Sequence, residues 1–163
     1  MEKLEQAKSI ALKFVAVRMR TQLEVEQQLQ KKGYDADIIA ETVAFLREYQ
    51  YLDDEAYCRC WIHDRVEFHP CGRQKMFFDL AKKVTDRQLV RLSLENYFPA
   101  EVELELAVSA AHKKLAGGSK AVSREQLSRF LYGRGYGGEI INQVLQIEEI
   151  NEQLYQRQSD NNF

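Results

Sequence analysis

The chain has 163 residues, 45% of them apolar and 29% charged, and its 23 Lys and Arg against 25 Asp and Glu give a formal net charge of −2. A chain of this length can bury about 70% of its unfolded surface without disulfides or metals, and its balanced charge excludes a polybasic tail or a strongly acidic solvating chain. It has two prolines where average usage of about 5% predicts about eight, which disfavours a turn-rich sandwich or barrel and favours long helices.

Apolar runs and cysteines indicate the expected location and redox state of the chain. No apolar run approaches the roughly eighteen residues of a membrane span, and the segment Met1 to Gln6 has no apolar signal core, so a cytoplasmic location is expected. The three cysteines, Cys58, Cys60 and Cys71, are odd in number and close in sequence, which is typical of reduced thiols rather than of a disulfide framework.

The first part of the chain predicts three helices. The first covers Leu4 to Arg20, and Thr21 with Glu24 has the spacing of a capping box that begins the second. Gly33 suits the left-handed turn that ends the second helix, and Asp35 is a good N-cap for the third. Two amphipathic helices joined by a turn therefore follow an initial helix.

This pattern recurs every 51 residues along the chain. Five positions are apolar in all three copies, and they are Val25, Met76 and Leu127; Leu29, Leu80 and Leu131; Ile38, Leu89 and Ile140; Ile39, Val90 and Ile141; and Val43, Leu94 and Leu145. Gly72 and Ser123 align with Thr21, Asp86 and Gly137 with Asp35, and Gly135 with Gly33. The middle copy has Val84 at the turn, which predicts a strained or reshaped connection there.

Helical stretches from Asp54 to Phe68 and from Ala100 to Ala116 precede the second and third pairs. We therefore expect an all-α fold, an elongated array of three tandem three-helix repeats with nine helices. The predicted divisions are 1–52, 53–98 and 99–156, followed by a polar tail, 157–163, that should fray.

Charge is distributed in blocks that the total conceals. Residues 69–91 carry a net +4 and residues 107–136 a net +5, whereas residues 92–106 and 137–163 each carry −4. Any single basic residue could be a solvated helix-end cation. Equivalent positions of stacked repeats line one side of a solenoid, however, so the set predicts a basic stripe for a nucleic-acid-bearing or acidic partner. Its candidate residues are Lys32, Arg73, Lys75, Lys82, Lys83, Lys113, Lys114, Arg124, Arg129 and Arg134.

The sequence is compatible with three other interpretations. A three-helix unit also describes a helix-turn-helix DNA reader, although stacking repeats are commoner. A metal site among Cys58, Cys60, His63, His69 and Cys71 is disfavoured because Cys58 and Cys60 lie about 200° apart on a helix. Nine aromatic residues could be base-stacking platforms but at helical spacing are expected mostly in the core: Tyr49, Tyr51, Tyr57, Trp61, Phe68, Phe77, Phe78, Tyr97 and Phe98.

No nucleophile elbow, phosphate-binding loop or His-containing triad is present, so an enzyme is not expected and no cofactor or metal is predicted. Asp53 and Asp54 are best explained as caps of the helix that follows them.

Particular residues carry a resemblance to the RecX family, regulators of the RecA recombinase. In the first half they are Ala11-Leu12, Arg18, Thr21, Glu24, Leu29, Lys32-Gly33-Tyr34, Ile39, Leu46, Tyr51-Leu52-Asp53-Asp54 and Ala56. In the second half they are Gly72, Leu80-Ala81-Lys82-Lys83, Lys113-Lys114-Leu115, Leu131, Arg134-Gly135-Tyr136 and Ile141. The resemblance spans about Ala7 to Leu145 and departs from the family at Val84, where a Lys-Gly turn is usual.

The resemblance implies a curved, non-enzymatic, monomeric regulator that lies in the groove of the RecA filament on single-stranded DNA. It would inhibit RecA and so regulate recombination, DNA repair and the SOS response. On this hypothesis the basic stripe contacts the filament, with direct DNA binding at most weak. The alternative is a stand-alone DNA-binding protein of the helix-turn-helix type.

Overall fold

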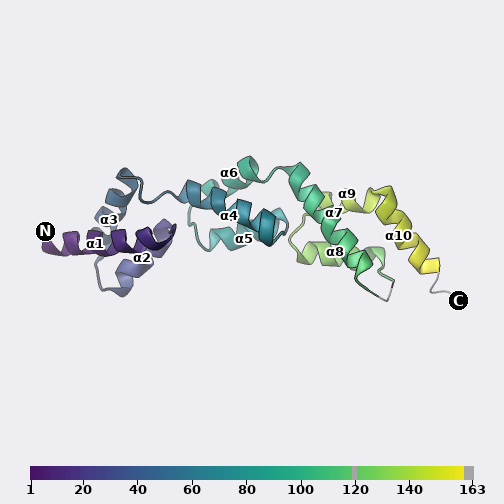
Figure 1. The fold of residues 1–163 in the computed structure, drawn as a ribbon, viewed down its shortest axis with the longest axis horizontal. Coiled ribbons are helices and arrows are strands. Elements are labelled where there is room, and N and C mark those ends of the chain that lie inside the picture. The colour runs from purple at the N-terminus through teal and green to yellow at the C-terminus, as the bar shows by residue number, and fades with distance from the viewer. Residues whose placement is uncertain (119–120, 160–163) are drawn as a thin grey trace. The chain divides into compact units, whose positions relative to one another are not determined.

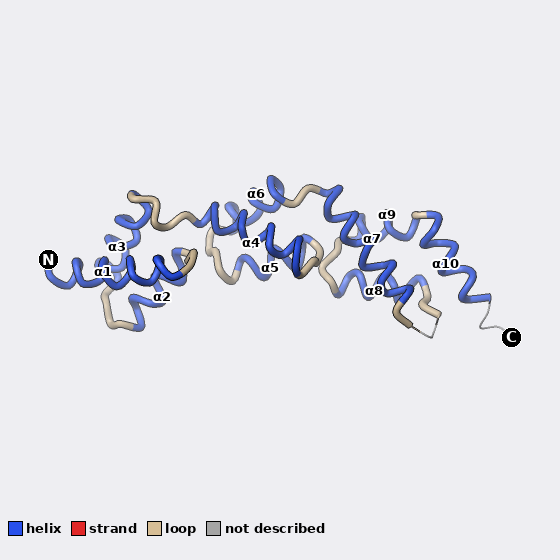
Figure 2. The backbone as a smooth tube through the Cα atoms, in the orientation of Figure 1, coloured by secondary structure: helices blue, strands red, loops and turns tan. Residues whose placement is uncertain are grey.

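The computed structural model describes residues 1–118 and 121–159, and in these residues it contains helices and connecting loops but no strand (Figures 1 and 2). The predicted all-α fold is therefore confirmed. The helices are α1 (Glu2–Val17), α2 (Gln22–Lys31), α3 (Ala36–Glu48), α4 (Asp54–Phe68), α5 (Arg73–Ala81), α6 (Arg87–Tyr97), α7 (Ala100–Ala116), α8 (Arg124–Gly133), α9 (Gly138–Gln146) and α10 (Glu148–Ser159).

The chain forms two compact units. The first unit comprises Met1–Trp61 and Asp79–Ser93, and the second comprises Ile62–Phe78 and Leu94–Phe163. In the first unit α1, α2 and α3 pack against one another, and in the second α7, α8, α9 and α10 do so. The division into three repeats at 52 and 98 stays a prediction.

The apolar positions of the repeat form the cores. Val25, Met76 and Leu127 are each fully buried, as are Leu29, Leu80 and Leu131 one helical turn further on. In the first unit the buried residues gather around Ala7, Ala11, Val43, Leu46 and Leu52 as well. The i and i+4 spacing in the sequence therefore identifies the buried face of α2, α5 and α8.

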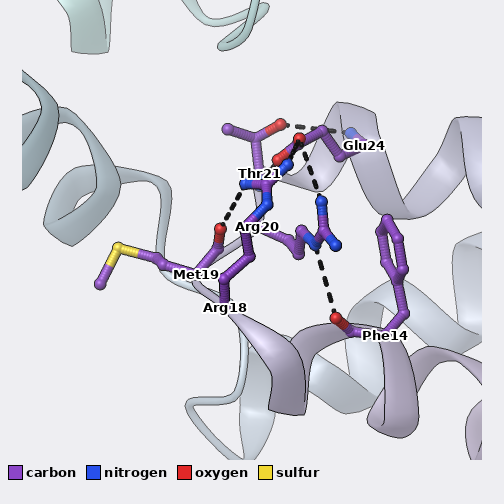
Figure 3. Close-up of polar contacts among 6 residues, drawn as sticks. All are labelled: Phe14, Arg18, Met19, Arg20, Thr21 and Glu24. Carbon is purple, nitrogen blue, oxygen red and sulfur yellow. Dashed lines mark hydrogen bonds and ion pairs between the residues drawn. The ribbon is translucent and has the colours of Figure 1, made fainter.

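The predicted capping box at the start of α2 is present, and two arginines form ion pairs with its Glu24 carboxylate (Figure 3). Thr21 Oγ1 accepts from the Glu24 amide at 3.2 Å, while the Glu24 carboxylate accepts from the Thr21 amide at 3.0 Å and from Arg18 Nη2 at 2.6 Å. The Arg20 guanidinium lies 4.0 Å from the centre of the Phe14 ring. Burial opposes ionisation of Glu24, but the Thr21 amide and Arg18 outweigh it and hold the pKa of the carboxyl below its ordinary value.

Gly33 and Gly135 both adopt the left-handed conformation expected of them, with φ of 84° and 87°. In each turn the following residue closes a six-to-one bond, from the Tyr34 amide to Leu29 O and from the Tyr136 amide to Leu131 O, both at 3.2 Å. The middle copy lacks this turn. Val84 is not left-handed; its amide bonds Leu80 O at 2.9 Å and its side chain is fully buried. Of the two predicted outcomes, the connection is reshaped rather than strained.

The expectation of nine helices is wrong, because the described residues form ten. The last apolar stretch breaks at Ile147, whose backbone is extended, and α10 then runs to Ser159. The break allows Ile150 and Leu154 to be buried in the second unit's core. The predicted fraying tail therefore begins inside a helix, and its last four residues, 160–163, lie outside the described residues.

A carboxylate accepts from the first amide of α2, and another does the same for α5. Asp54 Oδ1 accepts from the Gln22 amide at 2.9 Å, and Glu103 Oε1 accepts from the Arg73 amide at 2.8 Å. Asp54 is the first residue of α4 and Glu103 lies in the first turn of α7. Burial raises the pKa of the Asp54 carboxyl above its ordinary value, against the lowering effect of the Gln22 bond.

Gly72 brings two backbones together inside the second unit. The Gly72 amide donates to Arg134 O at 2.9 Å and the Gln74 amide donates to Gly135 O at 3.1 Å. The turn after α8 therefore supplies acceptors for the N-terminal amides of α5, which have no partner within their own helix. This contact requires residue 72 to lack a side chain.

Gln50 is the non-glycine residue with positive φ in the described chain, at 58°, where it ends α3 in the same kind of turn as Gly33. The left-handed conformation costs an L-residue about 1–2 kcal/mol, and glycine at position 50 would remove that cost. Glycine also loses more conformational entropy on folding, which offsets part of the gain. We therefore expect Gln50→Gly to raise the free energy of unfolding by about 0.5 kcal/mol. Gln27→Gly, at an exposed position within α2, should instead lower the free energy of unfolding by about 1 kcal/mol. Urea unfolding measures both, and an equal loss in the two variants would contradict the prediction.

Candidate functional site

Four of the ten predicted site residues line one cavity in the second unit. Lys113 and Lys114 lie in the last turn of α7, and Arg129 and Arg134 lie on and just after α8 (Figure 1). All four side chains are exposed, and the cavity they border has a volume of about 780 Å³. Gln126 and Phe130 complete the part of the wall that α8 contributes.

Phe130 holds two of these cations in place. Lys114 Nζ lies 5.3 Å from the centre of the Phe130 ring, and the Arg134 guanidinium carbon lies 5.2 Å from it. Such contacts are worth about 0.5–1 kcal/mol at exposed sites, which limits the freedom of both chains before any ligand binds. The aromatic ring thus spaces two positive charges along the cavity wall.

A second cavity of about 420 Å³ shares Lys113, Phe130 and Arg134 with the first. It adds a further predicted residue, Lys75 of α5, together with Arg65 near the end of α4 and His69 just after that helix. No carboxylate lines either cavity among the residues described. We call the surface that the two cavities form together the basic groove; its described lining residues include cations and no carboxylate.

The basic groove also contains an exposed aromatic side chain, Phe68, which is 68% exposed at the end of α4. The expectation that the aromatic residues are mostly core is wrong for Phe68 and also for Tyr49, Tyr51 and Phe78, all of which are at least half exposed. Helical spacing did not separate them from buried Tyr57 and Phe98. The sequence sign that could have done so for Phe68 is its place beside His69-Pro70, at a helix end rather than within one.

Arg73 is used within the fold. Its amide and Nε bond the buried Glu103 carboxylate, its Nη2 donates to Phe98 O, and its guanidinium lies 5.5 Å from the Phe98 ring. Arg124 is exposed and its Nη1 lies 3.4 Å from Leu145 O. Arg73 therefore has a structural role that its place in a basic block did not indicate.

The remaining predicted residues, Lys32, Lys82 and Lys83, are exposed and belong to the first unit. Lys82 Nζ lies 3.6 Å from Asp79 Oδ1, an exposed contact of little energetic weight. The first unit also has an acidic cavity of about 610 Å³, lined by Asp53, Asp54, Glu55 and Asp86. Asp53 and Asp54 act there as helix caps, since Asp53 Oδ1 accepts from the Ala56 amide at 3.0 Å.

The thiol cluster has no geometry for a metal. Cys58 and Cys71 are buried and Cys60 is exposed, and no group of three or more possible ligands is present in residues 1–118 and 121–159. Burial raises the pKa of the Cys58 thiol to about 11, which keeps it protonated near neutral pH. In the same described residues no helix has the length and apolarity needed to cross a bilayer.

Comparisons with known proteins agree with this architecture. Residues 7–46 match the family model for the first three-helix domain of RecX, and residues 101–145 match that for the third. The fold is similar to the crystal structure of RecX from Lactobacillus salivarius, with a TM-score of 0.82 at 21% identity over 92% of this chain and 97% of that one. A second crystal structure, of a regulatory protein RecX, gives a TM-score of 0.76 at 20% identity, covering 86% of this chain and 70% of that one.

Sequence relatives lead to the same family. The Regulatory protein RecX of Clostridium botulinum (strain Eklund 17B / Type B) is 33% identical over 150 residues, which cover 89% of this chain and 69% of that protein. The Regulatory protein RecX of Mycolicibacterium smegmatis is 31% identical over 160 residues, covering 94% and 85%. These relatives are named as regulatory proteins rather than as enzymes. The chain therefore belongs to the RecX family of regulatory proteins.

Proposed function

We propose that this chain is a non-enzymatic inhibitor of the RecA recombinase that binds in the groove of the RecA filament on single-stranded DNA. Through that contact it regulates recombination, DNA repair and the SOS response. Membership of the family makes RecA the first partner to consider. The observation that carries the proposal for this chain is the basic groove, because a filament on DNA presents both phosphate and protein surface to cations gathered along its wall.

The filament-contacting residues fall into two sets. Within the second unit we assign contact to the cations that line the basic groove: Lys75, Lys113, Lys114, Arg129 and Arg134. Within the first unit Lys32, Lys82 and Lys83 are exposed and available for the same role. Arg124 contributes from the start of α8, and Arg73 contributes only by holding α5 in place.

The direct test is the ATPase activity of RecA on single-stranded DNA with this chain added in substoichiometric amounts. We expect inhibition by the unmodified chain and loss of it in Lys113→Glu/Arg129→Glu, since two attractive charges become repulsive in one cavity. Lys3→Glu/Lys13→Glu, on exposed positions of α1, makes the same change in net charge and should inhibit normally. Unaltered inhibition by Lys113→Glu/Arg129→Glu would remove the basic groove from the mechanism.

A titration separates this function from a stand-alone DNA-binding protein. The inhibitor should bind RecA-coated strands more tightly than bare duplex DNA. Tighter binding to bare duplex DNA, with a steep dependence on salt, would instead support a stand-alone DNA-binding function.

A further inference from the structure

The basic groove places an exposed aromatic ring among cations. Phe68 ends α4 with 68% of its surface in solvent, and Arg65, His69 and Lys75 line the same cavity. Leaving a phenylalanine ring in water forgoes the burial that ordinarily stabilises it. Pro70, Lys113 and Arg134 line the same cavity as this ring.

Aromatic side chains beside a basic track are the pattern by which proteins bind single-stranded nucleic acid. A flat ring can stack on any base, and neighbouring cations neutralise the phosphates on either side. Duplex DNA offers the charge but not the base faces, which are already stacked within the helix. An acidic protein surface offers the charge but not a series of flat bases that alternates with it.

We propose that the basic groove holds a short stretch of single-stranded nucleic acid, with one base stacked on Phe68 and adjacent phosphates against Lys75, Lys113 and Arg134. Phe130 is a positioning residue in this site, because it fixes Lys114 and Arg134 along the path of the strand. The inference deepens the proposed function, since it identifies which part of a RecA–DNA filament the second unit contacts. It also requires that the chain bind the strand when RecA is absent.

The continuity of the two cavities supports an extended ligand rather than a single small anion. Lys113, Phe130 and Arg134 belong to both walls, so positive charge runs from Arg65 and Lys75 to Lys114 and Arg129 without an intervening carboxylate among the described lining residues. A strand carries a negative charge on every nucleotide and no positive charge of its own. The charge pattern of the groove is therefore complementary to a phosphodiester backbone.

The test uses the full chain alone and a fluorescein-labelled oligothymidylate, with binding followed by anisotropy at fixed salt. We expect Phe68→Ala to weaken binding about tenfold, the loss of one stacked base. Tyr132→Ala is the matched control, because Tyr132 is also 68% exposed, lies on α8 and lines neither cavity. It should bind the strand as the unmodified chain does. Circular dichroism checks that both variants keep their helix.

Two further arms use a duplex of matched length and a poly-glutamate competitor. The duplex should bind more weakly than the strand and should not respond to Phe68→Ala. Equal strand binding by Phe68→Ala and the unmodified chain, or poly-glutamate displacing the strand more effectively than unlabelled oligothymidylate, would overturn the stacking site. Since RecA is absent, these results stand apart from the proposed function: inhibition can fail while the strand still binds, and the reverse.

Discussion

Replacing Gly72 with alanine is expected to destabilise the second unit strongly. An added Cβ would lie 2.2 Å from the backbone carbon and oxygen of Gly135 and 2.3 Å from the Tyr136 amide, so the turn after α8 would have to leave the start of α5. The bonds from Gly72 and Gln74 to that turn would then be lost. Because backbone cannot yield as a flexible side chain can, we expect the free energy of unfolding to fall by about 3 kcal/mol or more.

Thermal unfolding followed by circular dichroism measures the effect. Gly133→Ala is the control within the same unit: it lies in the last turn of α8, an added Cβ meets nothing within 4 Å, and alanine should raise helix stability by about 0.5–1 kcal/mol. If Gly72→Ala melted with the unmodified chain, the close backbone approach would not be a requirement of the fold.

Loss of the Glu103 carboxylate has the second largest expected effect. Glu103 is only 4% exposed and accepts from both the Arg73 amide and Arg73 Nε, at 2.8 and 3.4 Å. Glu103→Ala would leave the Arg73 amide and Arg73 Nε without their acceptors and would remove the buried partner of the guanidinium charge, so we expect a loss of about 3 kcal/mol in the free energy of unfolding. Urea denaturation gives the value.

Two companion variants define the cause of this loss. Glu103→Gln keeps an acceptor oxygen for the amide and should retain part of the stability. Glu105→Ala removes an exposed carboxylate from the same helix and should change the free energy of unfolding by no more than about 0.5 kcal/mol. An effect of Glu103→Ala as small as that of Glu105→Ala would show that the bond to Arg73 contributes little.

Local signals predicted the parts of the fold that depend on neighbouring residues. Thr21 and Glu24 form their capping box, and Gly33 and Gly135 adopt the left-handed turn, because each arrangement is determined within a few residues. The 51-residue period added the core, since Leu29 and its two equivalents are buried alike. Val84, in place of the turn glycine, correctly predicted that the turn of the middle copy would differ from the other two.

Contacts between segments far apart in the sequence could not be predicted from these local signals. The sequence placed Glu103 in an acidic block, although its spacing of four residues from buried Ala107, Ala111 and Leu115 puts it on their inward face. That spacing was the available sign of a buried carboxylate, but its partner Arg73 is 30 residues away and could not be identified. The break at Ile147 likewise depends on tertiary packing rather than on the sequence pattern.

The candidate site residues were likewise only partly predictable from the sequence. The charge count found Lys113, Lys114, Arg129 and Arg134, which the fold brings to one cavity because two consecutive helices of one unit carry them. It also included Arg73, whose contacts with Glu103 stabilise the fold. A count of charges does not show which cations already have a partner.

The three aligned positions Thr21, Gly72 and Ser123 begin their helices in two different ways. Thr21 and Ser123 carry hydroxyls that accept from the Glu24 and Gln126 amides, both at 3.2 Å, so α2 and α8 are capped from within their own first turn. Gly72 has no side chain, and the first amides of α5 find acceptors on the backbone of the turn after α8. The start of α5 therefore depends on a segment about 60 residues further along the chain, and it should be lost in any state in which the turn after α8 is unfolded.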